Sequence, residues 1–174
     1  MNRHWLRVTA HTLLYIMLSA WCQQTVAIVF NIPDRTVPRL RLIVGSSGPR
    51  IDEVDFTVPL ADLGNGNPIT STSSISFQMV IRARASSPLT GILSADSSTP
   101  LSNGSSTLPF GDISWTSRDG DIPGGTFDGT AYQVLVTYPS SVRVNDRLTF
   151  IYANTRILEA GTYTGRVVYT LAFP

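Results

Sequence analysis

The sequence predicts an all-β protein, and two observations carry that prediction. Four segments alternate apolar and polar side chains with a period of two residues, as a strand with one buried face requires. Turn-forming clusters rich in Gly, Pro, Asn, Asp and Ser, such as "GSSGP" and "RDGDIPGG", separate these segments. Short strands between frequent turns, without convincing helical periodicity after residue 27, are typical of an immunoglobulin-like β-sandwich.

Residues 1–27 have the composition of a secretory signal peptide. Two Arg residues precede the apolar run "TLLYIMLSAW", and small residues precede a predicted cut after Ala27. The run is shorter than the roughly 20 residues that span a bilayer. A lipoprotein cut before Cys22 would place a bulky residue where a small one is required. We therefore expect cleavage of 1–27 and export of the remaining 147 residues.

The composition after this leader argues against catalysis. All thirteen cationic side chains are Arg, and both His residues and the single Cys lie within the first 22 residues. Cleavage therefore removes the commonest general bases, metal ligands and thiol or amine nucleophiles. It leaves eleven Arg against twelve acidic residues, a net charge of −1, without the cationic excess typical of nucleic-acid-binding proteins. We expect no enzymatic activity, no cofactor, no nucleic-acid partner and a core without internal disulfides.

Each alternating segment predicts which side chains face the core. The four expected sets are Ile75, Phe77, Met79 and Ile81; Tyr132, Val134, Val136 and Tyr138; Leu148, Phe150 and Tyr152; and Tyr163, Val167, Tyr169, Leu171 and Phe173. The stretch 94–107 is expected to be a loop, and "VDFTVPLADLG" to hold only a helical turn because Pro59 opposes a longer helix. Residues 38–174 are therefore interpreted as one domain.

Isolated features in these segments receive structural interpretations. Trp115 is expected in the core. The alternating pairs Arg39 with Arg41 and Arg82 with Arg84 are expected on a solvated strand face, where they also protect an edge.

The loop 112–128 is rich in Asp and allows three interpretations. Asp119, Asp121 and Asp128 are weak candidates for Ca²⁺ ligands, since that ion takes six to eight oxygen atoms. Paired carboxylates also serve as acid and base in glycosidases. Asp-Gly pairs are ordinary turn formers, and the loop lacks the spacing and terminal Glu of an EF-hand. We favour the turn interpretation and predict no metal site.

The two ends of the exported chain suggest an assembly device. The beginning, "IVFNIPDRTVPRLRL", alternates Ile28, Phe30 and Ile32 before Pro33 interrupts it. The chain ends with "GTYTGRVVYTLAFP", a last strand with no later segment to cover its edge. An exposed apolar edge is an aggregation hazard unless another strand pairs with it.

The C-terminal pattern resembles that of chaperone–usher fimbrial subunits. Ala160-Gly161-Thr162-Tyr163, followed by Gly165 and an alternating terminal strand, is similar to the cysteine-free alternate type of pilin. That type includes the major subunits of colonisation-factor and common pili. The "ISW" at residues 113–115 and "VPRLRLIVGSSG" fit the same pattern more loosely.

The resemblance implies an incomplete immunoglobulin-like sandwich that is completed by donor-strand exchange. Residues 28–37 would be the donor extension, with Ile28, Phe30, Ile32 and Val37 as donor side chains, although Pro33 removes one ladder hydrogen bond. Tyr163, Val167, Tyr169, Leu171 and Phe173 would form the acceptor groove and C-terminal strand. The implied partners are a periplasmic chaperone, an outer-membrane usher and neighbouring pilin subunits, in a homopolymeric or mixed fimbria at the cell surface.

Two other functions remain open from the residues alone. The chain is alternatively a self-contained secreted β-sandwich that binds carbohydrate or calcium through the 112–128 loop. A hydrolase with paired carboxylates ranks last, because the exported chain holds no His for a Ser-His-Asp arrangement.

Overall fold

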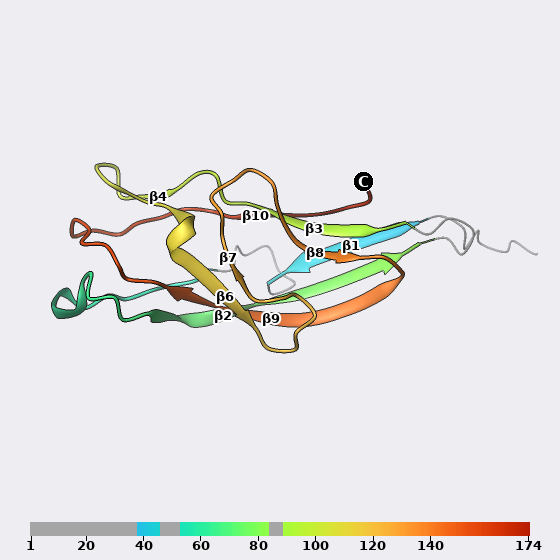
Figure 1. The fold of residues 1–174 in the computed structure, drawn as a ribbon, viewed down its shortest axis with the longest axis horizontal. Coiled ribbons are helices and arrows are strands. Elements are labelled where there is room, and N and C mark those ends of the chain that lie inside the picture. Colours follow the sequence, from blue (N-terminus) through green and yellow to red (C-terminus); the bar gives the residue numbers. More distant parts are fainter. Residues whose placement is uncertain (1–37, 46–52, 84–88) are drawn as a thin grey trace, which may run out of the picture. The chain divides into compact units, whose positions relative to one another are not determined.

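The computed structural model describes residues 38–45, 53–83 and 89–174, all within the unit Thr36–Pro174 (Figure 1). The expected leader at 1–27 and donor extension at 28–37 lie outside the described residues. Within the described ranges the regular structure consists of ten strands and two short 3₁₀ helices. The all-β prediction is therefore confirmed.

The larger sheet has five antiparallel strands. In chain order these are β1 (Arg39–Val44), β2 (Ile69–Arg82), β6 (Ile113–Ser117), β7 (Gly125–Thr126) and β9 (Val142–Tyr152). Their order in the sheet is β1-β2-β9-β6-β7, so the two long strands β2 and β9 lie at its centre (Figure 1).

The smaller sheet contains the C-terminal strand. Its order is β10-β3-β8, with β3 at Gly91–Asp96, β8 at Gln133–Tyr138 and β10 at Val168–Ala172. Both pairings are antiparallel, which places β10 at an edge of this sheet (Figure 1).

Short elements connect the sheets. The expected loop at 94–107 is partly regular, because β3 continues to Asp96 and β4 (Leu101–Ser102) pairs with β5 (Thr107–Leu108). The helical turn expected before Gly64 is the 3₁₀ helix η1 (Leu60–Asp62), and Pro59 precedes it. A second 3₁₀ helix, η2 (Phe110–Asp112), leads into β6.

The core lies between the two sheets. Phe77 and Met79 of β2 are fully buried, as are Leu93 and Ala95 of β3 in the smaller sheet. The rings of Phe77 and Tyr169 meet edge to face across the sandwich, with centroids 4.9 Å apart. The core includes Trp115, whose Nε1 donates to the carbonyl of Pro123 at 2.9 Å. The predicted faces of β2 and β9 are confirmed, since the apolar set at residues 75–81 and the set at 148–152 both face this core.

The predicted face of β8 is confirmed at its end, at Val136 and Tyr138, and wrong at its beginning, at Tyr132 and Val134. The register between β3 and β8 shifts between Leu93 and Ser94, where a bulge leaves Leu135 outside the regular pairing. Val136 and Tyr138 pack on the core as expected, but so does Leu135, and Val134 is 48% exposed. Tyr132, just before the strand, is 63% exposed. One extra residue reverses which parity faces inward, so Tyr132 and Val134 point to solvent.

Because of this bulge, we expect the stability of the protein to depend more on Leu135 than on its neighbour Val134. We expect Leu135→Ala to lower the free energy of unfolding by about 1–2 kcal/mol, since a half-buried side chain loses part of its packing. We expect Val134→Ala to cost less than about 0.5 kcal/mol. Urea unfolding of both variants checks this. A larger loss for Val134→Ala would contradict the bulged register.

Candidate functional site

The residues predicted to accept a donor strand lie where both sheets end. β10 pairs with β3 on one side only, and β1 pairs with β2 on one side only. Cα atoms of β1 and β10 come within 8 Å of each other. Even so, within residues 38–45, 53–83 and 89–174 no strand forms a ladder with the outer edge of either. In the described part of the chain, β1 and β10 are thus edge strands with one unpaired side each.

Half-buried apolar side chains flank these two edges, and we call this set the open flank. All of them pack against the buried core without being fully covered. The set is Leu42, Val44, Val54, Phe56, Val58, Tyr163, Val167, Tyr169 and Leu171. A sheet edge that carried only polar side chains would need no further cover, whereas these apolar side chains leave part of the core accessible.

The C-terminal side of the open flank follows the predicted alternation. Val167, Tyr169, Leu171 and Phe173 are half-buried, while the intervening residues 168, 170 and 172 are exposed. The terminal strand is shorter than expected, because β10 begins at Val168 and an isolated bridge joins Thr164 to Ser102 before it. Tyr163 therefore contributes from the segment before β10.

The N-terminal side of the open flank has two parts, β1 and the extended segment 53–58. The carbonyl of Asp55 accepts a hydrogen bond from the N–H of Thr72 at 3.1 Å, and that of Glu53 accepts one from Ser73 Oγ at 2.8 Å. These bonds hold the segment beside the first half of β2. Its alternation turns Val54, Phe56 and Val58 toward the core, although no strand is assigned there.

Two tyrosines in this region, one of them a member of the open flank, have hydroxyls with raised pKa values. Burial raises the pKa of the Tyr169 hydroxyl. The ring of Tyr152 meets that of Phe56 edge to face at 6.3 Å. Its hydroxyl is buried and has no hydrogen-bond partner among the described residues. Burial, and then the nearby Asp112 carboxylate, raise the pKa of Tyr152. The Tyr152 hydroxyl is thus a buried polar group whose burial no hydrogen bond within the described residues compensates.

The acidic loop is organised by a carboxylate that sequence reasoning missed. Asp146 of β9 is 2% exposed. It accepts hydrogen bonds from Ser117 Oγ at 2.7 Å, from the N–H of Ile122 at 2.8 Å and from the N–H of Asp119 at 3.1 Å. The N–H of Arg147 donates to it as well. Burial by itself would raise the pKa of Asp146, but these bonds together lower it below its ordinary value.

The candidate metal ligands are turn residues in the structure. The N–H and Oγ1 of Thr130 both donate to the Asp128 carboxylate, at 2.9 and 2.7 Å. The backbone carbonyl of Asp121 accepts a hydrogen bond from the Tyr138 hydroxyl at 2.8 Å. Asp119 contributes its N–H to Asp146. Within the described ranges, no three His, Cys, Asp or Glu side chains are grouped so as to hold a metal ion.

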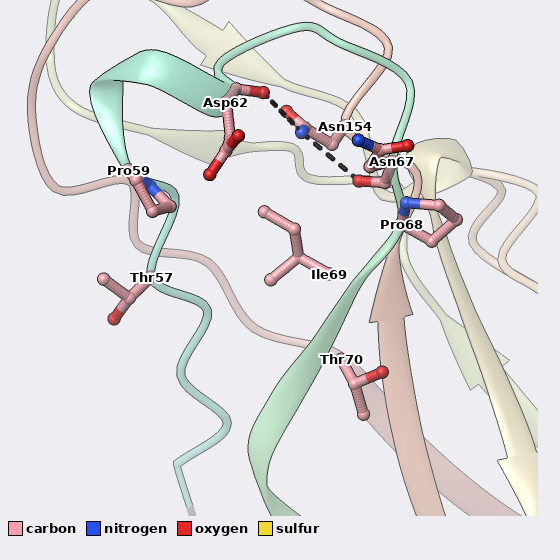
Figure 2. A pocket seen from close by; sticks show the side chains of 8 residues that line it. All are labelled: Thr57, Pro59, Asp62, Asn67, Pro68, Ile69, Thr70 and Asn154. Atoms are coloured by element: carbon pink, nitrogen blue, oxygen red, sulfur yellow. Dashed lines mark hydrogen bonds between the residues drawn. The ribbon is translucent and has the colours of Figure 1, made fainter.

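A shallow pocket lies beside η1, at the end of the sandwich where β2 begins (Figure 2). Its volume is about 400 Å³. Its lining is formed by Thr57, Pro59, Asp62, Asn67, Pro68, Ile69, Thr70 and Asn154.

Asn154 holds the turn that borders this pocket. Its amide nitrogen donates to the carbonyls of Asp62 and Asn67, at 2.8 and 3.3 Å, as Figure 2 shows. Its side-chain oxygen accepts from the N–H of Gly64 at 3.0 Å, and its own φ is 52°. Both the nitrogen and the oxygen of the amide thus bond to the turn after η1, and a structural role accounts for the polar side chain at this pocket.

Comparisons with known proteins identify no relative. No family model, no curated protein and no solved structure matches the chain. A search of the described residues finds no helix long and apolar enough to cross a membrane.

The buried carboxylate predicts a pH-dependent stability. We expect Asp146→Asn to lower the free energy of unfolding by about 2–3 kcal/mol at pH 7, because the amide places an NH₂ group among backbone donors. The lowered pKa of Asp146 means that the carboxylate stabilises the fold above about pH 4 and that this contribution is lost as pH falls through the folded-state value.

Urea unfolding at pH 7 and pH 3 measures both effects. The difference between the wild-type protein and Asp146→Asn should narrow at the lower pH. Asp119→Asn, at an exposed position of the same loop, is the matched control and should change stability by less than about 0.5 kcal/mol. Equal losses for the two variants would contradict the role assigned to Asp146.

The hydroxyl of Tyr152, which has no partner among the described residues, leads us to expect a buried substitution that does not destabilise the fold. We expect Tyr152→Phe to leave the free energy of unfolding unchanged or to raise it by up to about 1 kcal/mol, because a buried hydroxyl without a partner is costly. Thermal unfolding followed by circular dichroism is the measurement. A loss of more than about 1 kcal/mol would show that the hydroxyl has a partner.

Proposed function

We propose that the protein is a structural subunit of a surface fimbria that polymerises by donor-strand complementation. The open flank is the observation that carries this proposal. It joins unpaired edges of β1 and β10, within the described residues, to apolar side chains that a strand from another copy would cover. The proposed role includes a contribution of the assembled fimbria to adhesion.

The strand order supports an incomplete immunoglobulin-like fold. The order β1-β2-β9-β6 is that of strands A, B, E and D of such a domain, and β10 beside β3 is that of F beside C. β8, on the other side of β3, has no counterpart in the seven-strand order. In a complete domain a seventh strand, G, pairs with F. The outer edge of β10 is the place of that strand, and among the described residues nothing occupies it.

The proposed donor segment has a length that suits this edge. Residues 167–173 offer half-buried side chains at four alternate positions over about 20 Å. Ile28, Phe30 and Ile32 repeat with the same two-residue period. An added strand would place these side chains over the core while its backbone pairs with β10.

The proposal includes a route of assembly. After export and removal of residues 1–27, a periplasmic chaperone would cover the open flank of each subunit. The outer-membrane usher would then exchange the chaperone for the 28–37 extension of the next subunit. The product would be a homopolymer or a mixed fimbria on the cell surface.

This function predicts strand exchange between copies. We expect residues 28–174 to form a ladder of oligomers that survives detergent and collapses on boiling, because a donor strand buried in the open flank dissociates slowly. Deletion of residues 28–37 should abolish the ladder. Gel electrophoresis with and without boiling, together with sizing by light scattering, is the measurement.

Two substitutions in β10 test whether the donor strand binds to the side of this strand that belongs to the open flank. Leu171→Asp places a charge on the open flank, and Thr170→Asp places the same charge on the exposed side of the same strand. We expect the first to abolish the ladder and the second to retain it, with circular dichroism confirming that both fold. Monomers from the full 28–174 chain, with a soluble and cooperatively unfolding truncation, would contradict the proposed function.

A further inference from the structure

The pairing of three strands gathers arginines on the outer surface of the larger sheet. In the β1–β2 ladder Arg39 lies directly opposite Arg82. Two residues further along β1, Arg41 lies opposite Val80 of β2. On its other side, Val80 lies opposite Arg143 of β9. Residues directly opposite each other point to the same side of a sheet, so these side chains share one surface.

A fifth arginine extends this surface along β9. Arg147 has the same parity as Arg143 and is exposed. We call the exposed set Arg39, Arg41, Arg82, Arg143 and Arg147 the arginine face. Neighbouring strands lie about 4.8 Å apart and alternate residues about 7 Å apart, so its guanidinium groups form a two-dimensional array.

No acidic side chain balances this array in the three strands that form it. The one acidic residue of β1, β2 and β9, Asp146, faces the core with Phe77 opposite it. The one ion pair within the described residues joins Arg156 to Asp112, away from this array. The protein has almost no net charge, yet its fold gathers five of the thirteen arginines on one surface.

Such an arrangement costs stability in the free protein. Like charges directly opposite each other on adjacent strands repel, as at Arg39 and Arg82. A bound anion removes that repulsion. Arg presents a planar fork of donors that fits carboxylate and sulfate groups in pairs, and every cationic residue of this chain is Arg.

We propose that the arginine face binds an anionic polysaccharide that carries sulfate or carboxylate groups. Repeated anions along a sugar polymer match repeated guanidinium groups on a flat sheet. The large exposed apolar side chains, Leu60, Tyr132, Val134, Ile157 and Val168, all lie outside β1, β2 and β9. The face therefore presents no exposed aromatic ring to stack nucleic-acid bases and no large exposed apolar side chain to insert into a membrane.

This proposal rests on strand register and is independent of polymerisation through the open flank. If the protein forms a fimbria, each subunit repeats the arginine face, and the repeated sites raise the avidity for a long polysaccharide. A failure of either proposal therefore leaves the other standing.

Binding of heparin oligosaccharides to the purified protein, in the assembly state in which it is isolated, tests the proposal. We expect binding at 50 mM NaCl that weakens at 150 mM NaCl and is lost with chemically desulfated, N-acetylated heparin. The double variant Arg41→Gln/Arg143→Gln should raise the Kd at least about tenfold.

A charge-matched control separates this face from a general charge effect. Arg156→Gln/Arg166→Gln also removes two positive charges, but outside β1, β2 and β9, and should change the Kd less than about twofold. Circular dichroism verifies the fold of both variants. Equal weakening by the two double variants would overturn the proposal. Equally tight binding of double-stranded DNA, or salt-sensitive self-association without heparin binding, would overturn it too.

Discussion

The structure depends on a core between two separate sheets whose edge strands β1 and β10 are not joined by a ladder. β2 and β9 shield the core from one face, and β3 shields it from the other. Where the sheets end, β1 and β10 approach each other, but within the described residues no ladder connects them. The contact between the Phe77 and Tyr169 rings is one apolar link between the sheets near this side. The half-buried state of Leu171 and its neighbours follows directly from this geometry.

Two buried polar side chains hold loops in place in this protein, which has no internal disulfide to do so. Asp146 ties the 117–122 turn to β9, and Asn154 ties the turn after η1 to the end of the same strand. Each bonds backbone groups distant in sequence, 24 residues away for Ile122 and 90 for Gly64. Several hydrogen bonds compensate the burial of the Asp146 carboxylate and of the Asn154 amide. Each residue therefore positions a loop without leaving its side chain unsatisfied.

Alternation along the chain predicted much of the fold and the C-terminal part of the candidate site. The inward positions of β2, β9 and residues 167–173 are as expected, because burial on one sheet face needs a period of two. The alternation misplaces only Tyr132 and Val134, because one bulged residue in β8 reverses the parity before Val136. It also missed Asp146, whose value as an anchor arises from partners on another strand and turn. The predicted donor residues Ile28, Phe30, Ile32 and Val37 lie outside the described residues and stay predictions.

By itself, the sequence determined the all-β class, the inward faces of β2 and β9 and, after residue 27, a polar chemistry limited to Arg, acids, hydroxyls and amides. These properties follow from local residue order and composition. Only the tertiary structure decided that β10 is an edge strand beside β1 and that Arg39, Arg41, Arg82 and Arg143 share one surface. The physical reason is that strand order and register arise from contacts between segments far apart in the chain, which local periodicity does not contain.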